Sequence, residues 1–544
     1  MRRDINIGLT PLANASSFQF GTWDCEAIDW WKLQVIGCFD GERYAFFRDV
    51  DSFLDYILQK KYRSWRWFAH FGGRYDMNFI FDRLRVRKDV HVTFYCSGSM
   101  VLRMQIKYRG MNAYLCDSFR LLPAALRDLT KAFNVEHQKG EYDFTAMRFC
   151  RELLEYNESD CRGLHEVLTS FFEQTGIRSE TFATQALRYW RKEFLHRTIW
   201  TTHQNVSDFV RRSLHGGHVE VFKAEGELNA YDVNSMYPSV MCQAIPTDYI
   251  GESRTLNDSH YGFIEATVCI PDMYLPPLPY PIEKLFFPVG TMRAVWTSEE
   301  LIYAETKGVR IQKIHKSYYF GRDFIFREYV DRIYKLKKTS TEPTRTICKY
   351  LLNSLFGKFG QNPVKKVFCT IDQAPPGSFP IIDPEGKPSG FAYWERRSRA
   401  AYLLPHIAAS ITSMARLVLQ EKLNEHSYYC DTDSIFTTDK IPTGGELGDW
   451  TYLGSGHARF IQPKLYKFNG TWKAKGLNRA MSIDAFVDGD INEIIRRKSI
   501  KEALRTGTLA CEDVTTHKRL GKTRPKRAWT RNGDTRPWNI EELL

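Results

Sequence analysis

The feature that most constrains this chain is a pair of aspartates separated by one threonine inside an apolar run. Residues 429–436 read Y-C-D-T-D-S-I-F, so aromatic or apolar residues flank the two acids. The pattern predicts a hairpin whose tight turn at Thr432 directs Asp431 and Asp433 towards one cation. A plain aspartate-rich turn is the alternative, because aspartate is common in turns.

A second acidic position lies in Y-D-V-N-S-M-Y-P-S, residues 231–239, where an apolar strand is predicted to end at Asp232 and to turn into a helix. Asp232 alone would be an ordinary helix N-cap. A third segment, K-Y-L-L-N-S-L-F-G-K at 349–358, is predicted to be a helix with a cation, an amide and a flat surface in one row. Alone, it reads as an ordinary amphipathic helix. The residues in that row are Lys349, Asn353 and Phe356 or Gly357.

In chain order, these three segments resemble motifs A, B and C of the family B DNA polymerases. The resemblance implies that Asp232, Asp433 and the Val233 carbonyl hold two Mg²⁺ ions, with Mn²⁺ as a substitute and Asp431 close by. It implies that Lys349 neutralises the triphosphate of an incoming nucleotide and that Tyr237 excludes a 2′-hydroxyl. Other residues implied to bind the nucleotide are Ser235, Asn353, Phe356, which stands where the family usually has Tyr, and Gly357. The K-L-Y element at 464–466 resembles the family's K-x-Y, so the residues implied to contact DNA here are Lys464, Tyr466 and Thr432.

A second set of acids near the N-terminus resembles the Exo I, Exo II and Exo III motifs of the 3′–5′ exonuclease that precedes such polymerases. The segments are T-W-D-C-E-A at 22–27, A-H-F-G-G-R-Y-D at 69–76 and Y-N-E-S-D at 156–160. The resemblance implies two further metal ions, with Tyr156 orienting the attacking water and Lys139 as a catalytic lysine. The implied metal ligands are Asp24, Glu26, Asp76 and Asp160.

Single-strand binding is the part of this second resemblance that departs from the family. D-S-F at 117–119 resembles the strand-binding element, through Ser118 and Phe119. The Exo II loop, however, carries Phe71 where the family has Asn. We therefore expect the metal chemistry to be retained and Phe71 to stack on a base, because such stacking tolerates any sequence.

Two long segments favour one branch of the family. Residues 250–330 and 361–395 resemble the two terminal-protein regions of the protein-primed polymerases of bacteriophages and linear plasmids. This implies a priming protein as partner and strand displacement as an activity. H-G-G-H at 215–218 resembles the Y-x-G-G linker of that group through Gly216 and Gly217, with Leu214 in place of Tyr. His215 and His218 are interpreted as surface or DNA-contacting residues rather than metal ligands.

The predicted fold combines α/β and α+β domains: an RNase H-like exonuclease followed by a right-hand palm, fingers and thumb with two insertions. Strands are predicted at 18–27, 34–39 and 65–70 and a helix at 151–172, whereas the proline-rich stretches 271–290 and 375–390 are predicted to be loops or insertions without regular structure. The expected domains are the exonuclease at 1–180, the linker and first part of the palm at 181–249, the first insertion at 250–330, the fingers at 331–360, the second insertion at 361–395, the rest of the palm at 396–475, and the thumb with a basic C-terminal segment at 476–544.

Composition supports a nucleic-acid partner without proving one. The 76 Lys and Arg exceed the 64 Asp and Glu by 12, which attracts phosphate backbones. The 12 cysteines form no C-x-x-C pair, which argues against a disulfide scaffold or a zinc ribbon. No stretch has the ~18 consecutive apolar residues of a membrane span. We expect a monomer in the host cytoplasm that uses primer-template DNA, dNTPs and a single-stranded DNA-binding protein.

Four other functions remain alternatives or are rejected. A conventionally primed family B polymerase and a non-catalytic DNA-binding scaffold with decayed sites stay open. G-K-T at 521–523 resembles the end of a phosphate-binding loop, but Thr516 stands where the upstream Gly belongs, so a nucleotide-hydrolysing motor is rejected. A reverse transcriptase is set aside because Thr432 separates the two acids and an exonuclease accompanies them.

Overall fold

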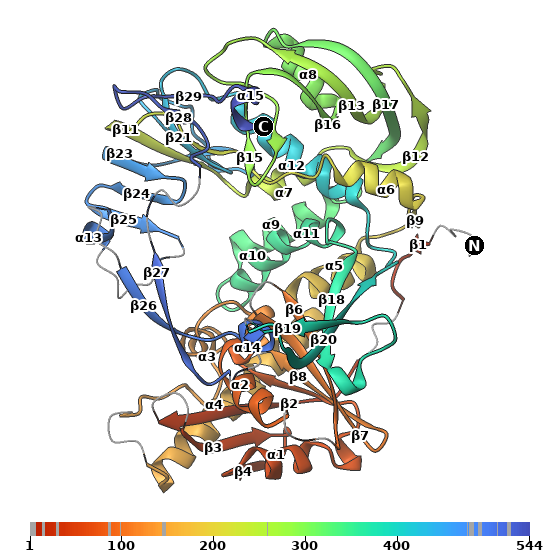
Figure 1. Cartoon of the computed structure of the whole chain (residues 1–544), viewed down its shortest axis with the longest axis vertical. Helices are drawn as coiled ribbons and strands as arrows, with labels where there is room; N and C mark the ends of the chain where they lie inside the picture. Colours follow the sequence, from red (N-terminus) through yellow and green to blue (C-terminus); the bar gives the residue numbers. More distant parts are fainter. Residues whose placement is uncertain are drawn as a thin grey trace.

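The structure is a computed structural model that describes the chain apart from short segments and single positions. The positions not described are 1–6, 14–16, 29–31, 85–86, 88, 98–99, 144–147, 258, 384, 476, 478–482, 488–491, 507, 509, 519 and 521–523. The G-K-T tripeptide therefore lies outside the described residues. The described part forms two halves, each built on a large sheet, with a group of helices between them (Figure 1).

A ten-stranded sheet forms the half at the bottom of Figure 1. Its strands, in spatial order, are β19 (Phe379–Ile382), β20 (Pro388–Arg397), β18 (Val364–Thr370), β6 (His91–Ser97), β7 (Met100–Tyr108), β8 (Met111–Asp117), β5 (Arg66–Ala69), β2 (Phe20–Ile28), β3 (Lys32–Phe39) and β4 (Tyr44–Phe47). β2, β5 and β8 run parallel in its centre. Parallel strands of this kind are covered on both faces, which explains why β2 is mostly buried.

The elements predicted for this half are confirmed, with ends that move by up to three residues. The predicted strands are β2, β3 and β5, and the predicted helix is α4 (Arg151–Thr175), which packs on β2 and β3. Three shorter helices complete this half: α1 (Val50–Ile57), α2 (Asp76–Leu84) and α3 (Leu126–Ala132).

The prediction of a loop across 375–390 is wrong for two parts of that stretch. β19 and the start of β20 lie within it. The neighbouring strand β18 pairs with β6, which belongs to the N-terminal part of the chain. Pro380 is tolerated because β19 is the edge strand of the sheet, where a missing backbone N–H breaks no ladder between two neighbours. The segment 361–395 therefore continues the N-terminal sheet.

A seven-stranded antiparallel sheet forms the core of the upper half. Its strands, in spatial order, are β10 (Val219–Val221), β21 (Ser427–Asp431), β22 (Ser434–Thr437), β11 (Glu225–Val233), β23 (Trp450–Gln462), β24 (Leu465–Phe468) and β25 (Thr471–Ala474). Helices α7 (Met236–Met241) and α12 (Pro405–Gln420) share one apolar core with Val233, Cys430 and Ile435 of this sheet.

A four-stranded sheet beside α12 is formed by residues 245–323. Its strands, in spatial order, are β12 (Ile245–Ser253), β17 (Arg310–Asp323), β13 (Tyr261–Ile270) and β16 (Gly290–Thr297), with helix α8 (Ser298–Thr306) following β16. The proline-rich stretch 271–290 is irregular, as predicted, apart from the two-residue strands β14 (Tyr280–Pro281) and β15 (Leu285–Phe286) and the first residue of β16.

Helices lie between the two halves in Figure 1. They are α5 (Phe182–Glu193), α6 (Gln204–Arg211), α9 (Arg327–Thr339), α10 (Thr344–Ser354) and α11 (Phe356–Phe359); the two-residue strands β1 (Gly8–Leu9) and β9 (Ile199–Trp200) pair nearby. None of the helices in the described residues is long and apolar enough to cross a membrane. All twelve cysteines are described, and no disulfide joins any of them.

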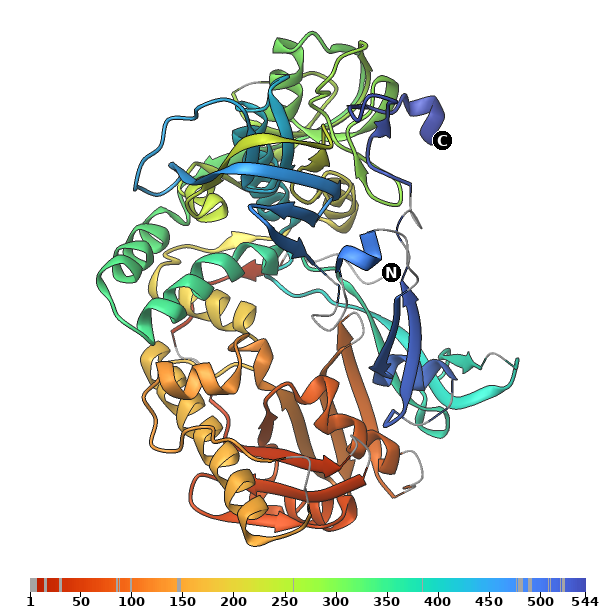
Figure 2. The same cartoon turned by 90° about the vertical axis from the view of Figure 1, so that its left-hand side faces the viewer.

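The C-terminal part leaves the upper half, reaches the lower half and returns (Figure 2). After α13 (Ile483–Val487), the hairpin of β26 (Asn492–Arg497) and β27 (Asp513–Lys518) carries α14 (Ile500–Thr506), whose apolar residues join the core of the ten-stranded sheet. Asp82 accepts the N–H groups of Ala510 and Cys511 at 2.7 and 2.9 Å. The chain then returns through β28 (Ala528–Trp529), β29 (Thr535–Arg536) and α15 (Ile540–Leu543).

Candidate active sites

The predicted turn between β21 and β22 is confirmed at Thr432. Its φ of +63° lies in the left-handed region, which side chains other than glycine adopt rarely. Two backbone hydrogen bonds hold this turn from outside: the Thr432 N–H donates to the His218 carbonyl at 2.8 Å, and the Val233 N–H donates to the Asp433 carbonyl at 2.7 Å. The turn is thus fixed between the strands on either side of the hairpin.

Sheet register places the polymerase-type acids together. Asp431 and Asp232 are each paired with Ser434, from opposite sides of β22, so their side chains leave the same face of the sheet. Burial, and then the charge of Asp433, raises the pKa of Asp232 to about 7. Burial also raises the pKa of Asp433, with a contribution from the charge of Asp431. These carboxylates repel one another, as expected where a divalent cation belongs.

Lys464 of the K-L-Y element contacts the same acids. Its Nζ lies 2.6 and 2.7 Å from the two carboxylate oxygens of Asp431. The Tyr429 hydroxyl donates to Asp431 Oδ2 at 3.1 Å and accepts the Lys464 N–H at 3.0 Å. Tyr466 packs against the Tyr429 ring with centroids 5.2 Å apart. Asp431 is therefore already paired with a cation, whereas no ion pair is found for Asp232 or Asp433 within the described residues.

The residues predicted to bind a nucleotide lie at α7 and on the consecutive helices α10 and α11. The Tyr237 ring of α7 stacks on the Phe356 ring of α11, with centroids 4.4 Å apart and planes inclined by 27°. Ser235, with a φ of +56°, immediately precedes α7. The helix predicted over 349–358 is interrupted at Leu355, where α10 gives way to α11. On these helices, the exposed residues are Arg345, Lys349, Asn353 and Gly357.

Two further cations lie near Lys349, and the sequence analysis missed them. Burial, and then the charges of Lys349 and Arg345, lowers the pKa of Lys337 on α9. Helix α9, which carries Lys337, packs against α10, which carries Lys349 and Arg345. The run of basic residues at the end of α9 was the available signal.

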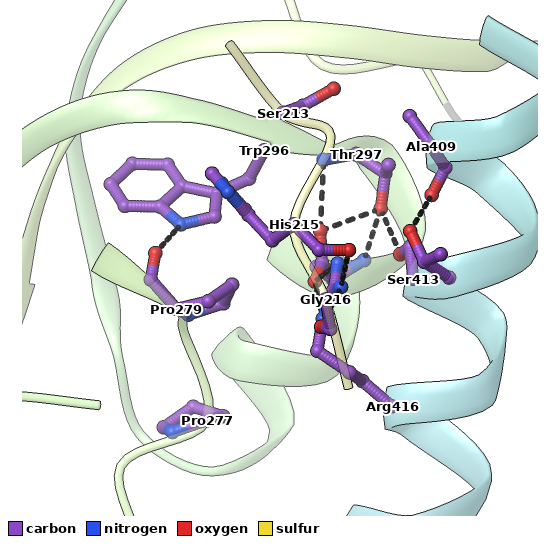
Figure 3. A network of polar contacts seen from close by, with 12 residues as sticks. Ser213, His215, Gly216, Pro277, Pro279, Trp296, Thr297, Ala409, Ser413 and Arg416 are labelled. Atoms are coloured by element: carbon purple, nitrogen blue, oxygen red, sulfur yellow. Dashed lines mark hydrogen bonds and ion pairs between the residues drawn. The ribbon is translucent and has the colours of Figure 1, made fainter. Parts of the chain in front are cut away.

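The predicted linker loop at 215–218 is clamped by a buried ion pair that no sequence pattern indicated (Figure 3). Arg416 of α12 binds Glu300 of α8 at 2.6 Å and donates to the carbonyls of His215 and Gly216 at 3.0 and 2.8 Å. A Cβ on Gly217 would come within 2.8 Å of Thr432, so only glycine fits against the catalytic-type turn. The loop thereby joins the first insertion, α12 and the turn.

The interpretation of His215 and His218 as surface or DNA-contacting residues is wrong. They are 7% and 2% exposed, respectively, and burial lowers the pKa of His215 to about 4. Neither is found among the described groups of side chains spaced to hold a metal ion. The side chains of both histidines are neutral and point from the loop into the interior of the protein.

Three of the four exonuclease-type acids converge. Ligand oxygens of Asp24, Glu26 and Asp160 all lie within 4.8 Å of one another. Asp76, at the start of α2, instead accepts the N–H of Cys25 at 2.9 Å, which holds its carboxylate against the same strand. Burial, with the charge of Asp24, raises the pKa of Glu26 to about 10 and that of Asp160 to about 6. Such a cluster fits hard divalent cations, which would relieve the repulsion.

Lys139 lies inside this cluster, as the sequence predicts. Its Nζ forms an ion pair with Asp160 and a hydrogen bond of 2.8 Å with the Tyr156 hydroxyl. Two supporting residues were missed: Asn157 donates to Asp24 Oδ2 at 3.3 Å and accepts a hydrogen bond from Tyr44 at 2.8 Å. Their sequence separations, 133 and 113 positions, leave no local pattern to find.

The strand-binding candidates form one aromatic group. Phe71 takes a φ of +66° and meets Phe119 edge to face, with centroids 4.8 Å apart. Phe71 is 38% exposed, so one side of its ring remains available to a base. Ser118 accepts or donates a 3.0 Å hydrogen bond with His70, which ties the D-S-F element to the Exo II loop. A Cβ on Gly73 would lie 2.3 Å from the Val101 carbonyl, which explains the glycine there.

Comparison with known proteins decides the family. The sequence matches the family described as "DNA polymerase type B, organellar and viral" over residues 58–150 and 145–379, more than half of the chain. The chain belongs to the organellar and viral type B DNA polymerases. Members of family B generally use divalent metal ions, which agrees with both acidic clusters.

Several relatives share most of this type B polymerase chain. A probable DNA polymerase of Ascobolus immersus is 25% identical over 83% of the chain and 44% of its own length. The DNA-directed DNA polymerase of Enterobacteria phage PRD1 is 26% identical over 73% of the chain and 72% of its own length. The DNA polymerase of Bacillus phage phi29 is 22% identical over 81% of the chain and 84% of its own length. The chain spans less than half the length of the fungal relatives it matches.

The fold of this type B polymerase is also found in a solved structure. Phi29 DNA polymerase complexed with primer-template DNA and incoming nucleotide substrates matches with a TM-score of 0.72 and 18% identity, over 93% of this chain and all of that one. The predicted multidomain α/β architecture is therefore confirmed at the level of a phi29-polymerase-like fold.

Proposed function

We propose that this chain is a DNA-directed DNA polymerase with a 3′–5′ proofreading exonuclease, and that it replicates linear viral or plasmid DNA from a protein primer. The observation that carries the proposal is the left-handed turn at Thr432, which holds Asp433 next to Asp232 on the seven-stranded sheet, here called the palm-like sheet. Primer-template DNA and dNTPs would be its substrates, as in the complex of the phi29 enzyme.

In the proposed synthesis, the primer 3′-oxygen attacks the α-phosphorus of a dNTP, a new P–O bond forms, and pyrophosphate leaves. Asp232, Asp433 and the Val233 carbonyl would hold two Mg²⁺ or Mn²⁺ ions, which stabilise the charge on the attacking and leaving oxygens when bound. Lys349, with Lys337 and Arg345, would bind the triphosphate, because these cations gather on the fingers-like helices.

Neighbouring residues would position the substrates of this reaction. The stacked rings of Tyr237 and Phe356 would form the platform under the sugar and base of the nucleotide and would exclude a 2′-hydroxyl. Lys464 would exchange its ion pair with Asp431 for the primer end when DNA binds, because phosphate competes for the same ammonium group. Tyr466 would fix the strand that carries Lys464.

In the proposed editing reaction, Asp24, Glu26, Asp76 and Asp160 would hold the ions, and Tyr156 would orient the water that attacks the terminal phosphodiester. Lys139 would stabilise the charge that develops on the phosphate, since it already lies beside Asp160. Phe71, Phe119 and Ser118 would bind the unpaired primer end by stacking and hydrogen bonding.

Protein priming is proposed from the two insertion-like regions at 250–330 and 361–395 and from the phage relatives. The first would contact the priming protein. The second, which continues the N-terminal sheet through β18, would hold the template and support strand displacement. A single-stranded DNA-binding protein would protect the displaced strand.

Extension of a 5′-labelled primer tests the proposed activities. With Mg²⁺ and dNTPs the primer should lengthen, and without dNTPs it should shorten. Neither change, with folded protein, would instead support a DNA-binding scaffold. Protein priming is tested by incubating the chain with a terminal-protein candidate and labelled dNTP. A covalent protein-nucleotide product is expected, and extension of RNA or DNA primers without that product would support a conventionally primed polymerase.

A further inference from the structure

The C-terminal segment is attached to the palm-like sheet by its backbone. The Ala224 N–H donates to the Gly533 carbonyl at 3.0 Å, and the Thr535 N–H donates to the Phe222 carbonyl at 2.9 Å. Further along, the Ile540 N–H donates to the Val289 carbonyl at 2.9 Å, next to the four-stranded sheet. The returning segment thus joins the palm-like sheet to the first insertion.

The charged side chain of Arg527 in this segment is buried against the palm-like sheet. Arg527 is 2% exposed, and its Nε donates to the Thr535 hydroxyl at 2.8 Å while one terminal nitrogen donates to the Tyr274 carbonyl at 2.9 Å. The guanidinium carbon lies 5.0 and 4.9 Å from the ring centroids of Phe222 and Tyr274. The other terminal nitrogen lies 3.5 Å from a carboxylate oxygen of Glu220 on β10.

Glu220 is equally buried and has a second partner. His218 Nε2 lies 3.1 Å from the same Glu220 oxygen, and the His218 ring stacks on Phe287 with centroids 3.7 Å apart. Burial alone would raise the pKa of Glu220, but the hydrogen bond from His218 and the charge of Arg527 hold it below its usual value. Glu220 is therefore an anion whose partner comes from a segment 307 positions away.

This ion pair lies directly behind the turn that carries the catalytic-type acids. Glu220 is paired with Cys430, and its neighbour Val219 is paired with Asp431. Because side chains alternate between faces, Glu220 and Cys430 lie on the face opposite to Asp431. The His218 carbonyl, two residues before Glu220, accepts the N–H of Thr432. β10 is an edge strand, so no further strand of the sheet holds it from the other side.

We propose that Arg527 and Glu220 are positioning residues for the polymerase carboxylates, acting through β10 and the His218 carbonyl on the turn at Thr432. The proposal rests on the proposed polymerase function. Removing Arg527 takes away the ion-pair partner of the buried Glu220 carboxylate and leaves only the more distant charge of Lys526, which costs more than removing both members of the pair. β10 would then move, and the turn would lose the hydrogen bond that keeps Thr432 left-handed.

The test compares Arg527→Gln, Glu220→Gln and the double variant in single-nucleotide incorporation by the full chain. We expect Arg527→Gln to lower kcat about 100-fold, since small displacements of reacting groups have effects of that size. KM for dNTP should change less than about threefold, and the Mg²⁺ concentration for half-maximal activity should rise, because the carboxylates are displaced rather than the nucleotide site. The double variant should recover part of kcat, since neither Arg527 nor Glu220 is then left as an unpaired buried charge.

Degradation of single-stranded DNA by the same preparations serves as the control, because the acids of the exonuclease site lie in the lower half, on β2, α2 and α4. It should stay unchanged. Arg87→Gln is the matched variant, since Arg87 pairs with Asp51, Asp55 and Asp89 in the lower half; it should leave nucleotide incorporation unchanged. Glu220→Gln replaces Arg527→Gln if the latter does not fold, since it removes the same ion pair from the other side.

Two results would overturn the positioning role. One is wild-type incorporation by Arg527→Gln or, where that variant does not fold, by Glu220→Gln. The other is equal loss of synthesis and degradation, which would assign the pair to the fold alone. Absence of synthesis by the wild-type chain would instead refute the proposed polymerase function.

Discussion

The two acidic sites of this chain gather carboxylates in different ways. In the upper site, Asp232 and Asp431 leave one face of an antiparallel sheet and Asp433 sits in a left-handed turn, all of them half-buried. In the lower site, Glu26, Asp76 and Asp160 are buried and come from a strand and two helices. The upper site therefore depends on the backbone geometry of the sheet and the turn. The lower site depends on the pairing of buried carboxylates with a cation, Lys139.

The cation in each site reflects this difference. Lys464 pairs with Asp431, the acid that the metal ions are not expected to need, so Asp232 and Asp433 keep their mutual repulsion. Lys139 pairs with Asp160 inside the metal-ligand cluster itself. Burial raises the pKa of Glu26 to about 10 but that of Asp232 only to about 7. The lower site should therefore hold its protons more firmly when no metal is bound.

The largest expected effect is the separation of the two activities. Asp433→Ala should lower primer extension by about 1,000-fold or more and leave degradation intact, because it removes a ligand of the upper site only. Asp24→Ala combined with Glu26→Ala should do the reverse. Both are measured on one labelled primer-template. Loss of both activities in a folded variant would show that the two clusters are not separate sites.

A smaller effect is expected at the aromatic strand-binding group. Phe71→Ala should raise the KM for single-stranded DNA degradation about 5- to 100-fold, since stacking contributes about 1–3 kcal/mol per base. Phe71→Leu is the matched control that keeps bulk without a ring face. Degradation rates at saturating DNA should change little. If Phe71→Ala binds single strands as well as the wild type does, Phe71 is not the stacking residue.

The pH dependence of primer extension should report on Asp232. Without metal, this carboxyl holds its proton below about pH 7, so protons compete with Mg²⁺ there. The Mg²⁺ concentration for half-maximal extension should rise about tenfold per pH unit below 7 and stay flat above it. Titrating Mg²⁺ at several pH values measures this. A flat dependence across pH 6–8 would mean that Asp232 is already ionised in the metal-free protein.

The smallest expected effect concerns the stability of the metal-free protein. The folded state keeps a proton on Glu26 up to about pH 10, whereas the unfolded chain loses it near pH 4.5, so stability falls as the pH rises through that window. Glu26→Gln has no carboxyl proton to hold, so it removes this pH-dependent loss of folding free energy. It should raise Tm in EDTA by about 1–3 °C at pH 8, with little effect at pH 5. The exposed Glu173→Gln is the control. An equal gain at both pH values would contradict the burial argument.

The sequence predicted those features whose geometry depends on residues close together in the chain. The turn at Thr432, the end of β11 near Asp232 and the long helix α4 follow from residues that are neighbours in sequence. The resemblance to known motifs implied that Lys139 is a catalytic lysine, and the structure pairs it with Asp160. Their chemical roles remain predictions.

The parts that sequence did not predict depend on contacts between distant segments. Arg416 and Glu300 are 116 positions apart, and Arg527 and Glu220 are 307 apart, so no periodicity connects them. The stretch 375–390 was expected to be a loop because of its prolines, yet Pro380 lies in an edge strand that tolerates it. Whether a histidine such as His218 is buried also depends on segments far away in the chain.

Titration calorimetry with Mn²⁺ would test most directly whether the chain contains two separate cation-binding sites. The wild type, Asp433→Ala and the Asp24→Ala/Glu26→Ala variant should be compared at pH 8. We predict two classes of site in the wild type, and each variant should lose one class and keep the other with unchanged affinity. Loss of both classes in either folded variant, or retention of both in each, would contradict the assignment of separate polymerase and exonuclease metal sites.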